Sequence, residues 1–139
     1  MMSSNRIPGS SSVQKLLIDA DLVAARKAVR EAAVHLELSL INQTKLVTAA
    51  SELARNTILH GGGGEVRIAL FSCGPKQGIK LRFIDEGPGI ANLERAMADG
   101  YTSGTGLGLG LGGSKRLTDE FRIESEVGKG TTITVVKWK

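Results

Sequence analysis

The sequence of 139 residues holds a single cysteine, three prolines and few aromatic residues, which make up 4% of the chain. The lone Cys73 cannot form an internal disulfide and has no companions for a thiolate metal site, a pattern typical of a reducing compartment. No apolar run approaches the roughly 20 residues that span a bilayer, and the polar start of the chain lacks the apolar region of a signal peptide. We therefore expect a cytoplasmic protein with no membrane contact.

The chain has no strong excess of one charge and no room for a second domain. Its length and its 41% of hydrophobic residues predict one domain over residues 13–139, preceded by a flexible lead over residues 1–12. The formal net charge of +4 arises from 18 basic and 14 acidic residues that are interleaved. Such a balance falls short of the basic stripe of a nucleic-acid-binding protein, so we expect no nucleic-acid partner.

Glycine is what the chain has in excess. Its 18 glycines are about 13% of the residues, against a usual level of about 7%. Four lie together at 61–64 and six more lie between Gly104 and Gly113. No regular period and little proline accompany them, which excludes collagen-like and low-complexity chains.

Apolar periodicity predicts five strands and four helices. The strands are expected at 12–18, 65–72, 78–85, 121–127 and 131–138, and the helices at 22–36, from 39 or 42 to 60, at 93–98 and at 111–118. Asp19 or Asp21 is expected to cap the first helix, and the glycines at 61–64 to end the second, leaving it loosely tethered. This order predicts an α/β (α+β) sandwich, a mixed and mostly antiparallel sheet with helices on one face.

Two carboxylates stand out by position. Glu52 and Asn56 are four residues apart on the second predicted helix, so they share a face at the margin of the buried stripe. The alternative is a solvated Glu and an Asn near a helix end.

Asp85 continues the apolar alternation of its strand. A carboxylate at the edge of the core needs a partner, such as a ligand amino group. The alternative is a tight turn in which Asp85 bonds the backbone beside Gly87 and Gly89.

The glycine run from Gly104 to Gly113 leads into a predicted helix. Glycines allow close approach of a ligand, and a helix N-terminus attracts anions, so phosphate suits such a loop, with a flexible linker as the alternative. The run has neither P-loop spacing nor the strand-to-helix context of a dinucleotide fold. The long connection over 86–110 is of the kind that is functional or mobile. A last turn, Gly130-Thr131-Thr132, leads into the final strand and on its own is typical of a hairpin.

Taken in order, Glu52-x-x-x-Asn56, Asp85-x-Gly87-x-Gly89, Gly104-x-Gly106-x-Gly108 and Gly130-Thr131-Thr132 resemble the N, G1, G2 and terminal boxes of the GHKL ATPases, the superfamily of DNA gyrase and histidine kinases. The resemblance covers about residues 13–138. It is greatest to the small anti-sigma-factor serine/threonine kinases, and among these to the RsbT-type switch kinases of bacterial stressosomes. It implies a Bergerat ATP-binding fold, ATP and Mg²⁺ as cofactors, and a lid over about 90–105.

The resemblance also implies roles for single residues. Asp85 would accept a hydrogen bond from the adenine amino group, helped by Thr132 through water. Asn56 would bind both nucleotide and Mg²⁺, and Glu52 would be the catalytic base. The other implied nucleotide-binding residues are Gly87, Gly89, Thr105, Gly106, Leu107, Gly108 and Gly110. Leu109 and Gly112-Gly113 depart from the closest relatives, and we expect a more flexible phosphate loop there.

The implied partner is a STAS-domain protein, phosphorylated on Ser or Thr. The chain is also expected to act through a PP2C-type phosphatase or a sigma factor by binding. One alternative is an anti-sigma factor that sequesters a sigma factor and phosphorylates its antagonist, and another is a nucleotide-dependent binding module without kinase activity. The oligomeric state is left open, with a weak dimer as one alternative.

Overall fold

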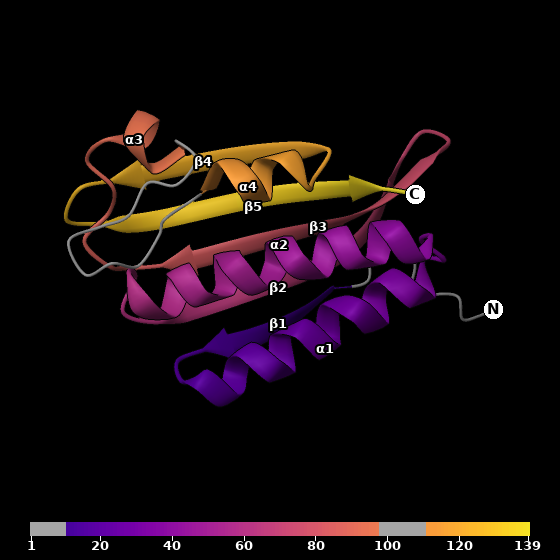
Figure 1. Cartoon of the computed structure of the whole chain (residues 1–139), viewed down its shortest axis with the longest axis horizontal. Coiled ribbons are helices and arrows are strands. Elements are labelled where there is room, and N and C mark those ends of the chain that lie inside the picture. Colours follow the sequence, from indigo (N-terminus) through magenta and orange to yellow (C-terminus); the bar gives the residue numbers. More distant parts are fainter. Residues whose placement is uncertain (1–10, 98–110) are drawn as a thin grey trace.

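The computed structural model describes residues 11–97 and 111–139, and within them the chain forms one antiparallel sheet with a layer of helices. The elements are β1 (Ser11–Leu16), α1 (Asp19–His35), α2 (Leu40–Leu59), β2 (Gly64–Cys73), β3 (Lys76–Asp85), α3 (Leu93–Met97), α4 (Leu111–Arg116), β4 (Glu120–Glu126) and β5 (Gly130–Trp138). Figure 1 looks onto the helical layer, with α1, α2 and α4 in front of the strands. The predicted order of elements is confirmed.

The strand order is β1-β2-β3-β5-β4, and all four neighbouring pairs are antiparallel. A parallel pair, which a mixed sheet would contain, is not found among the described strands. The reason lies in the connection between β1 and β2, because α1 and α2 run in opposite directions and so return the chain to β2 antiparallel to β1. The turn between β2 and β3 is tight, since only Gly74 and Pro75 separate the two strands.

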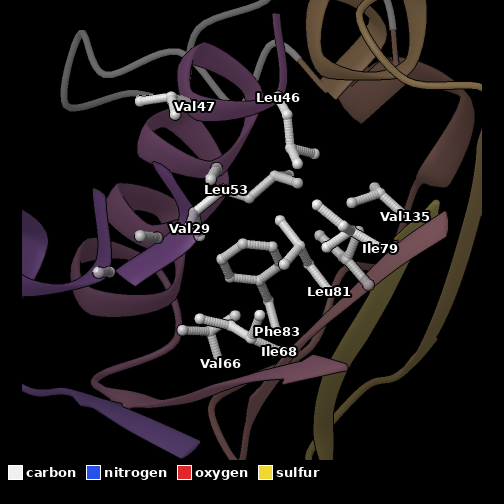
Figure 2. Close-up of a cluster of buried hydrophobic side chains, with 14 of the residues drawn as sticks. Val29, Leu46, Val47, Leu53, Val66, Ile68, Ile79, Leu81, Phe83 and Val135 are labelled. Atoms are coloured by element: carbon white, nitrogen blue, oxygen red, sulfur yellow. The ribbon is translucent and has the colours of Figure 1, made fainter. Parts of the chain in front are cut away.

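The core lies between α1, α2 and the helix-facing side of the sheet. Alternate residues of β2 and β3 point toward α2, as the side chains of Ile68, Leu81 and Phe83 do in Figure 2, where they belong to one buried cluster with Leu53. Burying a side chain of this size stabilises the fold by about 1.5–3 kcal/mol. The packing fixes α2 over β3, the two elements that carry the candidate site. No described helix combines the length and the apolar character needed to cross a membrane.

Asp21 holds the start of α1 from inside the first turn. Its Oδ2 accepts hydrogen bonds from the backbone N–H of Leu17 at 2.9 Å and of Ile18 at 3.1 Å. Of the two residues expected to cap α1, therefore, it is Asp21 that bonds the backbone at the start of the helix, although the N-cap position itself is Ile18. The two N–H donors, Leu17 foremost, lower the pKa of Asp21. Because the charged form is favoured in the folded state, this contribution to stability is lost as the pH falls through the lowered pKa.

Helix α2 is fixed at both ends. Ser39 caps its start, with Oγ accepting from the backbone N–H of Asn42 at 3.1 Å. At its end, the N–H of Gly61 donates to the carbonyl of Asn56 at 3.1 Å, and that of Gly63 donates to the carbonyl of Thr57 at 2.9 Å. The expectation of a loosely tethered end was wrong, because these bonds tie the glycines after the helix to carbonyls of its last turn.

An ion pair between a buried lysine and a partly exposed aspartate ties the loop after α4 to β5. Lys137 Nζ lies 3.4 Å from Asp119 Oδ1, with the lysine side chain only 7% exposed and the aspartate 37% exposed. Asp119 Oδ2 also accepts from the backbone N–H of Trp138 at 2.7 Å. The pair thus holds the end of α4 against the last strand.

Replacing Asp119 with Ala should lower the free energy of unfolding by about 3 kcal/mol, because it leaves a buried lysine charge without its partner and removes a backbone hydrogen bond. Urea denaturation measures the loss. The control is Glu126→Ala, which breaks an exposed pair with Lys129 and should cost less than about 0.5 kcal/mol. Equal effects of the two substitutions would contradict a structural role for the pair of Asp119 and Lys137.

Candidate functional site

A pocket of about 300 Å³ opens between the end of α2 and the adjoining ends of the central strands β3 and β5. This volume is at the lower end of the range of small-molecule sites, about 300–1,000 Å³. Its lining comes from α2, β3, the segment before and within α3, α4 and β5. The lining residues are Asn56, Thr57, His60, Gly61, Phe83, Asp85, Pro88, Gly89, Ile90, Ala91, Asn92, Arg95, Leu111, Thr131 and Ile133.

Asp85 is the carboxylate that lines this pocket. Its Oδ1 accepts hydrogen bonds from the backbone N–H of Gly87 at 2.9 Å and of Thr131 at 3.3 Å. Oδ1 therefore bonds the backbone of the turn, as the alternative interpretation of Asp85 predicted. Its Oδ2 has no donor among the described residues and lies beside Gly61, another pocket residue. The carboxylate is thus oriented by the backbone and keeps one oxygen for a ligand.

Gly61 allows α2 to end directly against this carboxylate. A Cβ placed on Gly61 would lie 2.4 Å from Asp85 Cγ and 2.5 Å from its Oδ2. The sequence predicted only that Gly61 helps to end the second helix. That prediction was incomplete, because Gly61 also lies against the pocket carboxylate. The signal is not visible in one sequence, because the contact depends on the register that pairs Gly64 with Asp85.

Gly61→Ala should lower the free energy of unfolding by about 2 kcal/mol, since the added methyl group must displace Asp85 from both of its N–H donors. Thermal or urea denaturation measures this. Gly113→Ala is the matched control, because a Cβ there meets only the far end of Arg116 at 3.9 Å and a helical Ala gains up to about 1 kcal/mol over Gly. Wild-type stability in Gly61→Ala would show that the close approach is not required.

The turn that follows Asp85 packs on the hairpin between β4 and β5. Gly89 has a φ of +77°, and a Cβ on it would lie 2.4 Å from the carbonyl oxygen of Glu126. Nearby, Ser125 Oγ accepts from the backbone N–H of Ile90 at 2.7 Å. The structure therefore brings Gly87 and Gly89 to the Asp85 end of the pocket, where Gly87 supplies an N–H and Gly89 lines the wall.

On β5, Thr131 rather than Thr132 faces the pocket. Thr131 is buried and lines the pocket beside Ile133, whereas Thr132 is paired with Ile84 and Glu124 on the other side of the sheet. The assignment of Thr132 was therefore wrong by one residue. The sequence contained the signal, because Thr131, Ile133 and Val135 alternate in phase and define the face toward the core.

Asn56 and Glu52 are placed differently. Asn56 is 7% exposed and lines the pocket. Glu52 lies one turn earlier on α2, outside the pocket lining, with its side chain 44% exposed and its Oε1 3.2 Å from Arg55 Nη1. Of the two carboxylate candidates, therefore, only Asp85 lines the described pocket.

Three further residues line the pocket that sequence patterns did not single out. The Nε2 atom of His60 is buried and finds no hydrogen-bond partner within the part of the chain that the structure describes. Asn92 and Arg95 line the wall from α3 and the turn before it. A buried, unsatisfied ring nitrogen in a pocket wall is the kind of group that a polar ligand satisfies.

Several predicted residues lie outside the described part of the chain. They are Thr105, Gly106, Leu107, Gly108 and Gly110, together with residues 98–105 of the expected lid over 90–105. The description resumes at Leu111, which lines the pocket.

The chain matches known proteins over most of its length. Residues 41–139 match the family described as histidine kinase-, DNA gyrase B- and HSP90-like ATPase. The serine/threonine-protein kinase RsbT of Bacillus subtilis (strain 168) is 41% identical over 127 residues, which are 91% of this chain and 96% of the relative. An anti-sigma F factor of Thermoanaerobacter sp. (strain X514) is 33% identical over 120 residues, 82% of each chain.

Solved structures share the fold at lower identity. The RsbU and RsbW domains of a Mycobacterium tuberculosis protein match with a TM-score of 0.65 and 20% identity, over 93% of this chain and 33% of that one. The SiaB–SiaC complex of Pseudomonas aeruginosa matches with a TM-score of 0.55 and 11% identity, over 93% of this chain and 89% of that one. The chain therefore belongs to the histidine kinase-, DNA gyrase B- and HSP90-like ATPases, within which it groups with the small serine/threonine-protein kinases of the RsbT type.

Proposed function

We propose that the chain binds Mg-ATP in the pocket at Asp85 and transfers the terminal phosphoryl group to Ser or Thr of a STAS-domain protein in the cytoplasm. By family it is a serine/threonine-protein kinase of the GHKL class. The observation that carries the proposal is Asp85, whose Oδ1 is held by two backbone donors while Oδ2 remains for a ligand donor.

The adenine base fits the Asp85 end of the pocket. The exocyclic amino group of adenine is a donor that Asp85 Oδ2 accepts, and Phe83 and Ile133 provide an apolar floor for the ring. Thr131 replaces Thr132 as the polar neighbour of Asp85. His60 supplies a further polar atom at the wall, where its buried Nε2 needs a partner.

Asn56 is suited to hold Mg²⁺ together with the nucleotide. Its amide oxygen is a hard ligand, and its side chain is buried in the pocket wall. Among the described residues, no cluster of three His, Cys, Asp or Glu side chains could hold a metal ion alone. A single amide oxygen from the protein fits an ion that takes most of its remaining ligands from phosphate oxygens and water. When bound, the ion neutralises charge on the phosphates.

The phosphates would extend from the base toward the glycine run that precedes Leu111. The backbone N–H groups of Gly106, Gly108 and Gly110 would hold them, with Leu107 in the same loop and Thr105 reaching the terminal phosphate. Glu52, one turn before Asn56, would orient or deprotonate the attacking hydroxyl group. In phosphoryl transfer this positioning contributes more than basicity, because the transition state is loose.

Transfer of labelled phosphate tests the kinase proposal. The purified chain should move the terminal phosphate of ATP to a Ser or Thr of a STAS-domain protein from the same genome. A STAS-domain protein whose phosphorylated residue is changed to Ala is the control for specificity. Bound ATP without transfer to any such protein would refute the kinase proposal and leave the nucleotide site intact.

A second candidate function is regulation by binding. The anti-sigma F factors among the relatives favour it, at 33% identity over 82% of the chain. In this case the chain, with nucleotide bound, would sequester a sigma factor or switch on a PP2C-type phosphatase. Pull-down experiments with and without ATP, comparing STAS-domain protein, phosphatase and sigma factor, distinguish these partners.

A further inference from the structure

The sheet has a second face that no described helix covers. In Figure 1, α1, α2 and α4 lie together in front of the sheet. Strand residues that alternate with the core residues point the other way, among them Arg67 on β2, Arg82 on β3 and Arg122 on β4, all exposed. We call this surface the open face.

A row of arginines crosses the open face. The strand register places Arg67 opposite Arg82, Arg82 opposite Thr134, and Thr134 opposite Arg122. Arg67 pairs with Glu65, and Arg122 lies 3.9 Å from Glu124. Arg82 has no carboxylate partner among the described residues, although it directly opposes another arginine. Like charges in direct cross-strand positions are destabilising, so the row costs stability in the free protein.

An aromatic pair lies at one end of the same face. The ring centroids of Phe71 and Trp138 are 5.1 Å apart, and both rings are partly exposed. Lys76 Nζ lies 4.7 Å from the Trp138 ring, and Lys80 Nζ lies 5.1 Å from the Phe71 ring. Tryptophan and arginine are the residue types that contribute most at the centres of protein interfaces.

The charges on the open face favour a partner with acidic groups. Arg82, Lys80 and Lys76 have no carboxylate partner among the described residues, whereas Glu65 and Glu124 already pair with arginines. The two glutamates lie in the row next to the arginines, where they would repel the continuous phosphates of a nucleic acid. A protein surface with separate acidic and apolar groups matches this arrangement of basic, acidic and aromatic side chains better than a nucleic acid does.

We propose that the open face is a docking surface for an acidic patch of a partner protein, separate from the nucleotide pocket. The pocket lies on the helix-covered side, because Phe83, Thr131 and Ile133 line it from there. A protein on the open face therefore cannot present its own hydroxyl group to the nucleotide. It binds while the pocket is occupied, as a regulatory partner that is not phosphorylated through this contact.

Trp138 is a built-in reporter of this docking. It is the only tryptophan of the chain, so 5-fluorotryptophan places a single ¹⁹F signal on the open face. The probes are a purified STAS-domain protein and a purified PP2C-type phosphatase from the same genome, chosen because of the proposed function, and a DNA duplex of about 20 base pairs. Each is titrated into the wild type with and without ATP.

Arg82→Glu is the test variant, and Arg26→Glu, an exposed position on α1, is the matched control. We expect the phosphatase to shift the ¹⁹F signal with and without ATP. Arg82→Glu should weaken that binding about ten-fold or more, and higher salt should weaken it too, while Arg26→Glu leaves it unchanged. Transfer of phosphate to the STAS-domain protein by Arg82→Glu should equal that of the wild type.

Three results would overturn the docking proposal. They are the absence of a ¹⁹F shift with the phosphatase, equal binding by Arg82→Glu and wild type, and an Arg82-dependent shift with the STAS-domain protein or with duplex DNA. None of them bears on the kinase proposal, which fails only when the wild type transfers no phosphate.

Discussion

Asp85→Asn should weaken ATP binding by about 100-fold or more. In the wild type, Oδ1 accepts from the N–H groups of Gly87 and Thr131, and Oδ2 is left for the adenine amino group. In the variant, the amide oxygen is needed for the two backbone donors, so the amide NH₂ faces the amino group of adenine. A charged hydrogen bond is thereby replaced by two opposed donors, which costs about 3 kcal/mol.

Calorimetric titration with Mg-ATP measures this loss. The change is nearly isosteric and keeps both backbone hydrogen bonds, so the free energy of unfolding without nucleotide should stay within about 1 kcal/mol of the wild type. Asp119→Asn is the matched control and should leave the affinity for ATP unchanged, because Asp119 lies in the loop after α4 and contacts the far end of β5. An Asp85→Asn protein that binds ATP normally would remove the adenine assignment.

Glu52→Gln should abolish most phosphoryl transfer while ATP binding is retained. Glu52 lies outside the lining of the described pocket and its side chain is 44% exposed, so its removal does not disturb the base site. A positioned acid–base group contributes about 10²- to 10⁴-fold to a rate, and a glutamine amide neither orients the hydroxyl group as a carboxylate does nor accepts its proton. Single-turnover transfer to the STAS-domain protein measures the effect separately from nucleotide binding.

Glu31→Gln, at an exposed position of α1, is the control and should transfer at the wild-type rate. Arg55→Ala removes the partner of Glu52 and separates the role of the carboxylate from that of the ion pair. If Glu52→Gln transferred phosphate at the wild-type rate, Glu52 would be no more than a surface residue paired with Arg55.

Much of the fold could be predicted because its signals are local. Alternation in β2, β3 and β5 and helical spacing in α1 and α2 each report which face of an element is buried. The position of Asp85 at the edge of the core follows from the same alternation. The assignment of Thr132 was wrong, because the phase that Thr131 shares with Ile133 and Val135 places Thr131 on the core-facing side.

The features that the sequence did not predict depend on contacts between segments that are distant in the chain. Gly61 meets Asp85 only because the pairing of Gly64 with Asp85 brings the end of α2 to β3. The buried Nε2 of His60 and the place of Arg95 in the pocket wall are likewise products of packing. The same holds for the arginine row of the open face, since Arg67 and Arg82 become neighbours only through the register. One sequence does not reveal such pairs.

Base selectivity is the most direct measure of the central claim, that Asp85 holds adenine in this pocket. Calorimetric titration of the wild-type protein compares Mg-ATP with Mg-GTP. At the position of the adenine amino group, guanine has a carbonyl oxygen, which the Asp85 carboxylate repels, so GTP should bind about 100-fold more weakly than ATP. Equal affinity for the two nucleotides, or no binding of ATP, would contradict the account.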